Sequence, residues 1–297
     1  MNKHFITKSA LIIATGAMVL GTATSAVQAA KTDSTGKVLA MGSTALQPLV
    51  TQASEMYLES HPKVSITVQG GGSGAGLSHV GTGGVTIGNS DVFAEQKDGV
   101  DASKLKDHKV AVVGITPVVN TDIKLKNLTK AQVQSIFAGK TTNWKQVGGK
   151  DEKIVLINRA TGSGTRATFE QAIMGDVETA TAQEQDDNGA VQKIVAQTPG
   201  SISYLAFSYT TGKAAKGLKT IKVDGVKPSN KNVTTNKWTI WAYEHMYTVK
   251  KPDAATKKFV KYMTTKAVTK TATKKLGYVP MSAMKVVKDY KGNVTKK

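Results

Sequence analysis

The chain of 297 residues contains no cysteine. It therefore forms no disulfide bonds, and it cannot be anchored to a membrane through a lipidated cysteine. Acidic residues are also few, because 21 Asp and Glu stand against 40 Lys and Arg, which gives a formal net charge of +19. Aromatic residues make up only 6% of the chain, and the lysines are not interleaved with them or with arginines. This composition argues against a nucleic-acid-binding protein.

Metal-ligand and catalytic patterns are missing as well. The histidines are scattered without metal-ligand spacing, and no nucleophile and base form a recognisable pair. A P-loop is excluded because Gln134 stands where the first glycine is required before Gly139 and Lys140. We therefore expect no metal, no cofactor and no enzymatic activity. The histidines in question are His61, His79, His108 and His245.

Apolar runs of membrane-spanning length are absent, and the one notable run lies near the start of the chain. Lys3 and Lys8 precede an apolar stretch at Ala10–Leu20, and Val27–Ala29 has the small residues of a cleavage site. This order predicts a secretory signal peptide over residues 1–29. We expect an exported protein that is extracellular and soluble.

The positive charge is concentrated toward the end of the chain. Without Lys3 and Lys8 the net charge is +17, from 19 − 2. Residues 250–297 hold 14 Lys and 2 Asp, a local net charge of +12. Such a segment favours adhesion to an anionic surface such as a cell-wall polymer. The alternative is that these lysines are merely solvated on the faces of helices.

Hydrophobic periodicity predicts strands that alternate with helices. This order indicates an α/β fold with largely parallel sheets, whose ligand crevice lies beyond the carboxyl ends of the strands. The expected strands are residues 38–41, 63–69, 85–87, 109–119, 154–157, 201–206 and 238–249. The expected helices are residues 46–57, a short one near 77–80, 127–137, 165–174, 188–197 and one or two within 253–275.

Three glycine-serine turns precede helices, and they carry the functional signal. They are Gly42-Ser43-Thr44, Gly72-Ser73-Gly74 and Gly162-Ser163-Gly164-Thr165. A helix start has unpaired N–H groups and a partial positive charge, and glycine lets another group approach closely. Three such turns beside one arginine predict a site for a small oxyanion. Its expected donors are the hydroxyls of Thr44, Ser73, Ser163 and Thr165, the backbone N–H groups near Ala45, Gly164 and Thr165, and the guanidinium of Arg159.

Asp91 is the unexpected member of this set, since a carboxylate repels an anion. The repulsion is relieved when the anion carries a proton that the carboxylate accepts. Monohydrogen phosphate carries such a proton at neutral pH and sulfate does not, so Asp91 predicts rejection of sulfate. The alternative is that Asp91 only caps a turn in Asn89-Ser90-Asp91.

Together these segments resemble the phosphate-binding protein of bacterial phosphate ABC transporters, over about residues 37–284. The matching segments are GSTALQP (42–48), QGGGSGAG (69–76), IGNSD (87–91), GITPVVN (114–120), NLTKAQVQSIFAGKTTNW (127–144) and NRATGSGTRATF (158–169). Three positions depart from the pattern. Ala45 replaces an aromatic residue of some members, Thr161 replaces an acidic residue of many, and the lipobox cysteine of Gram-positive relatives is absent.

The resemblance implies a two-lobed, type II periplasmic-binding-protein-like fold with two crossover segments that form a hinge. The first lobe would comprise residues 30–115 and 245–297, and the second would comprise residues 116–244. The implied phosphate ligands are Thr44, Ala45, Ser73 and Asp91 from the first lobe, and Arg159, Ser163, Gly164 and Thr165 from the second.

The resemblance also implies the function. The protein would bind inorganic phosphate outside the cell with high affinity and deliver it, as a monomer, to the membrane permease of an ABC transporter. Two alternatives remain at this point. One is a binding protein for another oxyanion, such as molybdate, tungstate or sulfate, or for a phosphorylated metabolite. The other is a charge-retained cell-surface adhesin.

Overall fold

The computed structural model describes residues 35–297, apart from the side chains of residues 271–274. The predicted signal peptide, residues 1–29, lies outside the described residues. The described residues fold around one nine-stranded sheet in the order β2-β1-β3-β11-β4-β8-β6-β7, with β9 paired to β4. Its strands are β1 Gly36–Gly42, β2 Val64–Gly71, β3 Ile87–Ser90, β4 Leu105–Asn120, β6 Val155–Arg159, β7 Gln183–Gln185, β8 Ser201–Ala206, β9 Leu218–Thr220 and β11 Trp241–Val249.

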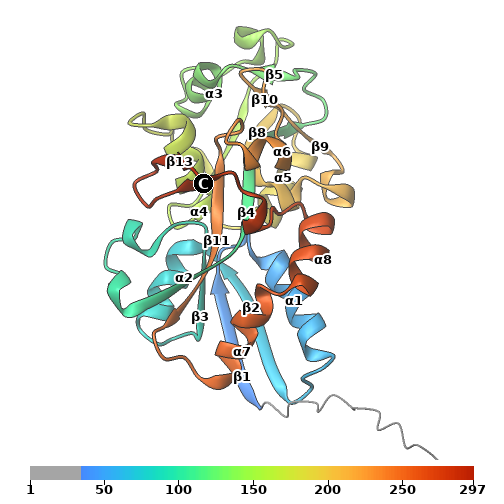
Figure 1. Cartoon of the computed structure of the whole chain (residues 1–297). Helices are drawn as coiled ribbons and strands as arrows, with labels where there is room; N and C mark the ends of the chain where they lie inside the picture. The colour runs from blue at the N-terminus through green and yellow to red at the C-terminus, as the bar shows by residue number, and fades with distance from the viewer. Residues whose placement is uncertain (1–34) are drawn as a thin grey trace, which may run out of the picture. The chain divides into compact units, whose positions relative to one another are not determined.

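Shorter strands and the helices complete the fold (Figure 1). Two small sheets pair β5 Asn127–Leu128 with β10 Lys222–Val223, and β12 Val286–Lys288 with β13 Val294–Lys296. The α-helices are α1 Gln47–Leu58, α2 Gly72–Gly81, α3 Lys130–Phe137, α4 Gly164–Phe169, α5 Asn188–Gln197, α6 Asn230–Thr234, α7 Ala254–Met263 and α8 Lys266–Leu276. The 3₁₀ turns are η1 Ala94–Gln96, η2 Ala102–Lys104, η3 Trp144–Val147, η5 Phe207–Tyr209, η6 Gly212–Ala215 and η7 Met281–Ala283, and η4 Glu170–Met174 is a π-helix.

The predicted α/β class is confirmed, but the expectation of largely parallel pairing is wrong for the two longest strands. β1 runs parallel to β2 and β3, and β6 runs parallel to β7 and β8. β11, in contrast, runs antiparallel to both β3 and β4, and β4 runs antiparallel to β8 and β9. Periodicity reveals that a segment is a strand and says nothing about its direction relative to its neighbours.

The long strand β4 belongs to both halves of the sheet. Its first part pairs with β11 as far as Gly114, and its last part pairs with β8 from Ile115 onward. β11 pairs with β3 on its other side, so β4 and β11 pass side by side through the middle of the sheet (Figure 1). The predicted crossovers, at 115/116 and 244/245, fall within these two strands.

Each half of the sheet is covered by helices on both faces. In β1, Val38 and Ala40 pack with α1 and α7, whereas Leu39 and Met41 pack toward the cluster that contains Leu77 of α2. This alternation follows from the two-residue period of a strand. In the other half, α5 covers one face, and α3, α4 and the tryptophans of the largest cluster cover the other. The strand ends that lead into helices are therefore enclosed within the protein.

Several helix starts agree with the sequence. Thr129 caps α3, and its hydroxyl accepts a hydrogen bond from the Gln132 N–H at 3.1 Å while the Gln132 side chain bonds back to the cap. α5 begins at Asn188, as predicted, after a cap by Asp187. α2 begins at Gly72, earlier than expected, because Gly71 adopts a φ of 113° that only glycine adopts readily.

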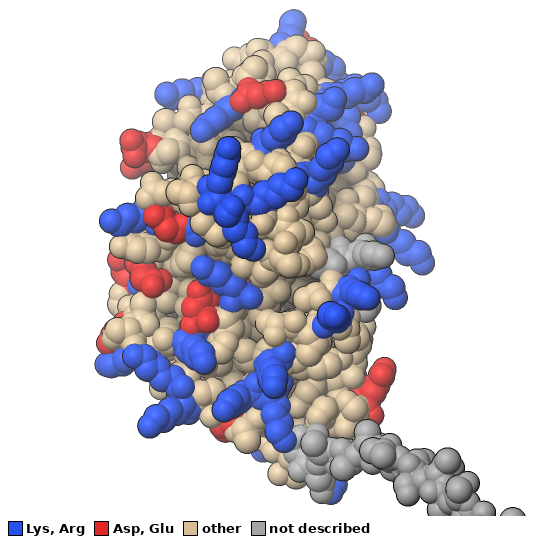
Figure 2. All heavy atoms as spheres, in the orientation of Figure 1, with Lys and Arg blue, Asp and Glu red and all other residues tan. Residues whose placement is uncertain are grey.

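Lysines cover much of the protein surface. Figure 2 shows Lys and Arg side chains spread over one face with few acidic side chains between them. Lys124 and Lys126 lie close enough to Lys219 that their charges, together with the larger effect of burial, lower the pKa of Lys219. Basic side chains therefore outnumber acidic side chains on this protein, and their charges are not fully neutralised.

Candidate anion-binding site

The serines of the first and third turns organise the helix starts around the site. The Ser43 hydroxyl accepts a hydrogen bond from the Leu46 N–H at 3.1 Å, just before α1. The Ser163 hydroxyl accepts from the Arg166 N–H at 3.2 Å and caps α4, which continues directly into η4. A serine that accepts a backbone hydrogen bond keeps its own hydroxyl hydrogen for another acceptor. Each turn thus presents hydroxyl and backbone donors together.

The three turns meet across the middle of the protein. The Gly74 N–H donates to the Gly162 carbonyl at 3.0 Å, and the Asp91 N–H donates to the Ser73 hydroxyl at 2.9 Å. The packing is so close that a Cβ added to Gly164 would overlap the Ser73 hydroxyl. The structure thus brings the predicted site residues together, and all of them are buried: Thr44, Ala45, Ser73, Asp91, Arg159, Ser163, Gly164 and Thr165.

Arg159 is fixed at the end of β6 by backbone carbonyls. Its Nε donates to the Gln185 carbonyl at 3.1 Å, and its Nη2 donates to the Asp186 carbonyl at 2.6 Å and to the Thr44 hydroxyl at 3.4 Å. Burial lowers the pKa of this guanidinium from its ordinary value, but an arginine keeps its proton in a protein. Nη1 has no hydrogen-bond partner among the described residues. A buried cation thus retains unused donor capacity.

A second arginine, Arg166, holds the backbone of Arg159 in place. Arg166 Nη1 donates to the Arg159 carbonyl at 2.7 Å. The same guanidinium pairs with Glu170 and with Glu184, each at 2.7 Å. Arg166 is therefore neutralised locally, and its role is to hold the backbone that carries Arg159.

Asp91 accepts hydrogen bonds from two distant segments. Ser43 donates to one carboxylate oxygen, and Thr165 donates to the other at 3.0 Å. Burial raises the pKa of Asp91, while the Ser43, Thr165 and Glu244 hydrogen bonds and the Arg159 charge oppose the rise. Because its partners come from other segments, Asp91 connects parts of the site and does more than cap its own turn.

Asn188 is a site residue that the sequence reasoning missed. Its Nδ2 donates to the Thr44 hydroxyl at 2.9 Å and to the Thr165 hydroxyl at 3.3 Å. Its Oδ1 accepts from the Ala206 N–H at 3.1 Å, which fixes the orientation of the amide. Asn188 is the first residue of α5, so a fourth helix start faces the site. An asparagine at a predicted helix start was the available signal.

Glu244 is the second missed residue, and it is completely buried on β11. Burial raises the pKa of Glu244 well above its usual value, and the neighbouring charge of Asp91 raises it further. Both effects favour the protonated form of this carboxyl. A charged residue type in the middle of an otherwise apolar strand was the signal for it in the sequence.

Ala45 is held through its carbonyl. The Tyr278 hydroxyl donates to that carbonyl at 2.5 Å, and the Ser208 hydroxyl donates to it at 3.4 Å. These bonds hold the peptide that follows Ala45. The Tyr209 hydroxyl donates to the Thr44 carbonyl at 2.8 Å and so orients the preceding peptide, which carries the Ala45 N–H.

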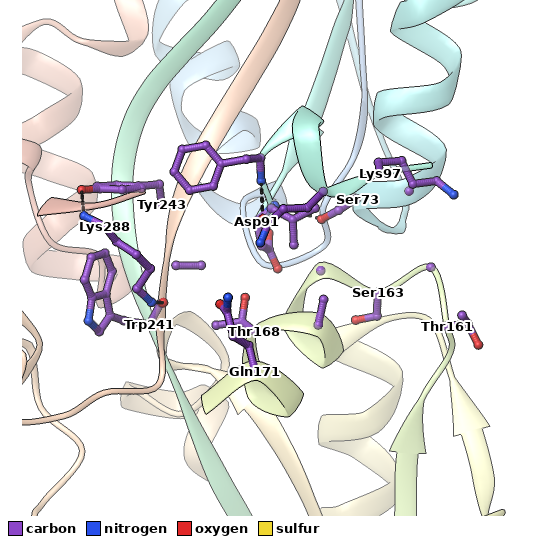
Figure 3. A pocket seen from close by; sticks show the side chains of 18 of the residues that line it. Ser73, Asp91, Lys97, Thr161, Ser163, Thr168, Gln171, Trp241, Tyr243 and Lys288 are labelled. Carbon is purple, nitrogen blue, oxygen red and sulfur yellow. Dashed lines mark hydrogen bonds between the residues drawn. The ribbon is translucent and has the colours of Figure 1, made fainter. Parts of the chain in front are cut away.

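A cavity of about 290 Å³ adjoins the site. Ser73 and Asp91 lie on one side of it and Ser163 and Thr168 on the other, as Figure 3 shows. At its far end, Lys288 Nζ lies 4.0 Å from the centre of the Trp241 ring and donates to the Trp241 carbonyl at 2.6 Å. Burial lowers the pKa of Lys288 to about 8. The space next to the predicted anion ligands is thus bordered by a desolvated cation.

Comparisons with known proteins agree with this site. Residues 27–267 match the model of the PBP superfamily domain. The phosphate-binding protein PstS of Bacillus subtilis (strain 168) is 47% identical over 257 residues, which cover 86% of this chain and 85% of that protein. The chain therefore belongs to the PBP superfamily and, within it, to the family of phosphate-binding proteins.

Solved structures give the same fold. A phosphate ABC transporter substrate-binding protein from Clostridium perfringens, solved with bound phosphate, has a TM-score of 0.75 and 27% identity, and the match covers 82% of this chain and 99% of that one. An ABC-type phosphate transport receptor from Vibrio cholerae has a TM-score of 0.65 and 26% identity over the same shares. The fold is the two-lobed, type II fold of periplasmic binding proteins. The predicted family and fold are confirmed.

Among the side chains that the structure describes within residues 35–297, no group of three or more His, Cys, Asp or Glu could hold a metal ion. None of the described helices has the length and apolarity needed to cross a membrane.

Proposed function

We propose that this protein binds inorganic phosphate between its two lobes and delivers it to the membrane permease of a phosphate ABC transporter. The observation that carries the proposal is the buried Nη1 of Arg159, a charged donor without a partner among the described residues. A buried charge is costly unless it is paired, so this donor favours an anionic ligand. The homologues, which are named phosphate-binding proteins, support the same ligand.

Asp91 supports phosphate over other oxyanions. Its carboxylate lies in the same buried cluster as Arg159, whose charge acts on it. A monohydrogen phosphate donates its proton to the carboxylate, and the guanidinium donates to its other oxygens. Sulfate, molybdate and tungstate are fully deprotonated at neutral pH and meet an ionised carboxylate without a proton between them. These oxyanions are therefore the less favoured ligands.

The proposed ligands are those that the sequence predicted. Thr44, Ser73, Ser163 and Thr165 provide hydroxyls, Ala45 and Gly164 provide backbone N–H groups, and Arg159 and Asp91 provide the charged contacts. We assign Thr44, Ala45, Ser73 and Asp91 to a first lobe of residues 30–115 and 245–297. The other four belong to a second lobe of residues 116–244. Because the ligand contacts both lobes, binding favours the closed form.

Isothermal titration of the protein with phosphate and with sulfate tests the proposal. We expect phosphate to bind with high affinity and sulfate to bind at least a hundred times more weakly. Equal binding of the two anions, or no binding of phosphate, would overturn the proposal. The protein should also leave phosphate esters intact, because it acts as a binding protein and has no enzymatic role.

A second proposal concerns the location of the protein. We infer that it is exported, that it acts as a monomer without a cysteine-linked lipid, and that its positive charge retains it on anionic cell-wall polymers. The gathering of Lys124, Lys126 and Lys219 and the lysine-rich face in Figure 2 favour such retention. Binding to purified wall fragments should fall steeply as salt rises from 50 to 500 mM, since screening shortens the range of charge interactions. Retention that is indifferent to salt would argue against it.

A further inference from the structure

The strand register places Glu244 next to Asp91. β11 runs antiparallel to β3, with His245 opposite Ser90 and Met246 opposite Asn89. Continuing that register by one residue places Glu244 opposite Asp91, which follows the last residue of β3. The register between β11 and β4 shifts between Glu244 and His245. Such an irregularity turns a side chain away from its regular direction, and here it falls at the residue that faces Asp91.

The groups around Asp91 and Glu244 determine which of the two carboxyls carries a proton. Both oxygens of the Glu244 carboxyl are buried without a hydrogen-bond partner among the described residues, and Asp91 is the charged neighbour that acts on this carboxyl. Two adjacent buried carboxyls cannot both ionise readily, and the Glu244 carboxyl has no donor or cation among the described residues that would stabilise its ionised form. Arg159 acts on Asp91, which favours the ionised form of Asp91 over that of Glu244.

The other titratable groups near this pair are tyrosines. The charge of Glu244 contributes to raising the pKa values of Tyr209 and Tyr278, although burial is the larger cause for both. Both phenols are therefore neutral at physiological pH. Arg159 is the cation that acts on Asp91, and Asp187 is a second carboxylate that acts on the same guanidinium.

We propose that Glu244 is a specificity-determining residue of this site, which donates a proton to Asp91 and keeps Asp91 an ionised acceptor for the hydroxyl of the bound anion. This proposal rests on the proposed function. An ionised carboxylate has about four acceptor positions. The hydrogen bonds from Ser43 and Thr165 use two of them. The proposed hydrogen bond from Glu244 uses a third, and the fourth is available to a ligand hydrogen.

The location of the proton decides which anion is accepted. With the proton on Glu244, Asp91 can only accept, and an anion without a hydrogen is repelled. With the proton on Asp91, the same carboxyl would donate, and sulfate would be accepted. Glu244 thus acts through Asp91 as a positioning residue, and it does not need to contact the ligand.

Three variants separate this role from a structural one. Glu244→Leu removes the donor, Glu244→Gln keeps a donor that does not titrate, and Met246→Leu is the control on the same buried strand, where a swap of similar volume is tolerated. Calorimetry with phosphate and with sulfate between pH 6 and 9 gives the affinities, and thermal unfolding confirms that each variant is folded.

We expect Glu244→Leu to lower the selectivity for phosphate over sulfate at least tenfold. Without the donor, Asp91 takes up a proton more readily and no longer repels sulfate. Glu244→Gln should keep the selectivity. We also expect the phosphate affinity of the unmodified protein to decline at high pH, where Glu244 ionises and adds a second negative charge, and Glu244→Gln to lack this decline. Met246→Leu should match the unmodified protein in both respects.

The failures can be told apart. If the unmodified protein does not bind phosphate, the proposed function fails, and this proposal fails with it. If the unmodified protein discriminates against sulfate and folded Glu244→Leu discriminates equally well, only the role of Glu244 is overturned. If Glu244→Leu does not fold, the comparison with Glu244→Gln decides. Identical pH profiles for that variant and the unmodified protein would overturn the proposal.

Discussion

The Thr165 hydroxyl donates to the Asp91 carboxylate over 3.0 Å, although the two residues are 74 positions apart in the sequence. Thr165 lies in the first turn of α4, which follows β6, and Asp91 follows β3, so this bond joins the two halves of the sheet. The halves are therefore in contact through groups that are also the proposed phosphate ligands. Ligand binding and closure of the two lobes act on the same hydrogen bonds.

Replacement of Asp91 by asparagine should reduce selectivity more than it reduces binding of anions in general. The amide is neutral and can donate, so sulfate is no longer repelled, while phosphate loses an ionised acceptor. We expect phosphate to bind about tenfold or more weakly and sulfate to bind more tightly, since hydrogen bonds to charged groups contribute about 1.5–3 kcal/mol. Calorimetry measures both, with Asp98→Asn as a surface control of the same charge change. An unchanged affinity ratio would contradict the role of Asp91 as a proton acceptor.

Replacement of Arg159 by methionine should weaken phosphate binding severely. Removal of one partner of a buried charged pair costs about 2–5 kcal/mol, which is roughly 30-fold to several thousandfold in affinity. Arg159→Lys should be intermediate, because lysine keeps the charge and loses the planar, two-donor geometry. Calorimetric titration of both variants with phosphate gives the order of their affinities. Binding by Arg159→Met at the unmodified level would show that the unpaired Nη1 does not contact the ligand.

Gly164→Ala should prevent tight closure. An added Cβ at Gly164 would overlap the Ser73 hydroxyl and lie 2.9 Å from the Asp91 Cβ. Gly162→Ala, two residues earlier in the same turn, is the matched control, because nothing lies within 4 Å of its added Cβ. We expect Gly164→Ala to lower phosphate affinity about tenfold or more and to reduce compaction on ligand addition in small-angle scattering. Similar behaviour of the two variants would show that this contact does not limit closure.

Lys288 should make stability depend on pH. Its folded pKa of about 8 lies below the ordinary lysine value of 10.5, so the folded state binds fewer protons than the unfolded state between these values. Stability should therefore rise with pH through this window, by up to about 3 kcal/mol. Below pH 8 the cost of burying the charge is fully present. Lys288→Met should lack this rise, which denaturant unfolding at pH 7 and pH 10 measures. An equal change in the free energy of unfolding between pH 7 and pH 10 for Lys288→Met and the unmodified protein would contradict the lowered pKa of Lys288.

Much of the site could be predicted from the sequence because its signals are local. A glycine-serine turn before an apolar helical pattern indicates a helix start. Every helix start carries unpaired N–H donors, so these donors can be predicted without knowledge of the rest of the fold. For Asp91 the chemical argument left a turn-capping role open, and the family resemblance placed it among the expected ligands. The structure brings these residues together within the distances of hydrogen bonds.

The site residues that could not be predicted from the sequence depend on contacts between distant segments. Glu244 faces Asp91 only because β11 returns antiparallel between β3 and β4, and periodicity does not give strand direction. Asn188 reaches Thr44 across 144 positions, and no pattern around either residue links them. Short strands such as β12 and β13 were missed because three residues carry too little periodicity.

The central claim is that one anion is held between Arg159 and Asp91. A crystal structure with phosphate, at a pH near 7, tests it most directly. We predict one tetrahedral anion within hydrogen-bond distance of both Arg159 Nη1 and an Asp91 carboxylate oxygen, with the Gly164 and Thr165 N–H groups directed toward it. An anion bound elsewhere, with Nη1 still unpaired, would contradict the account.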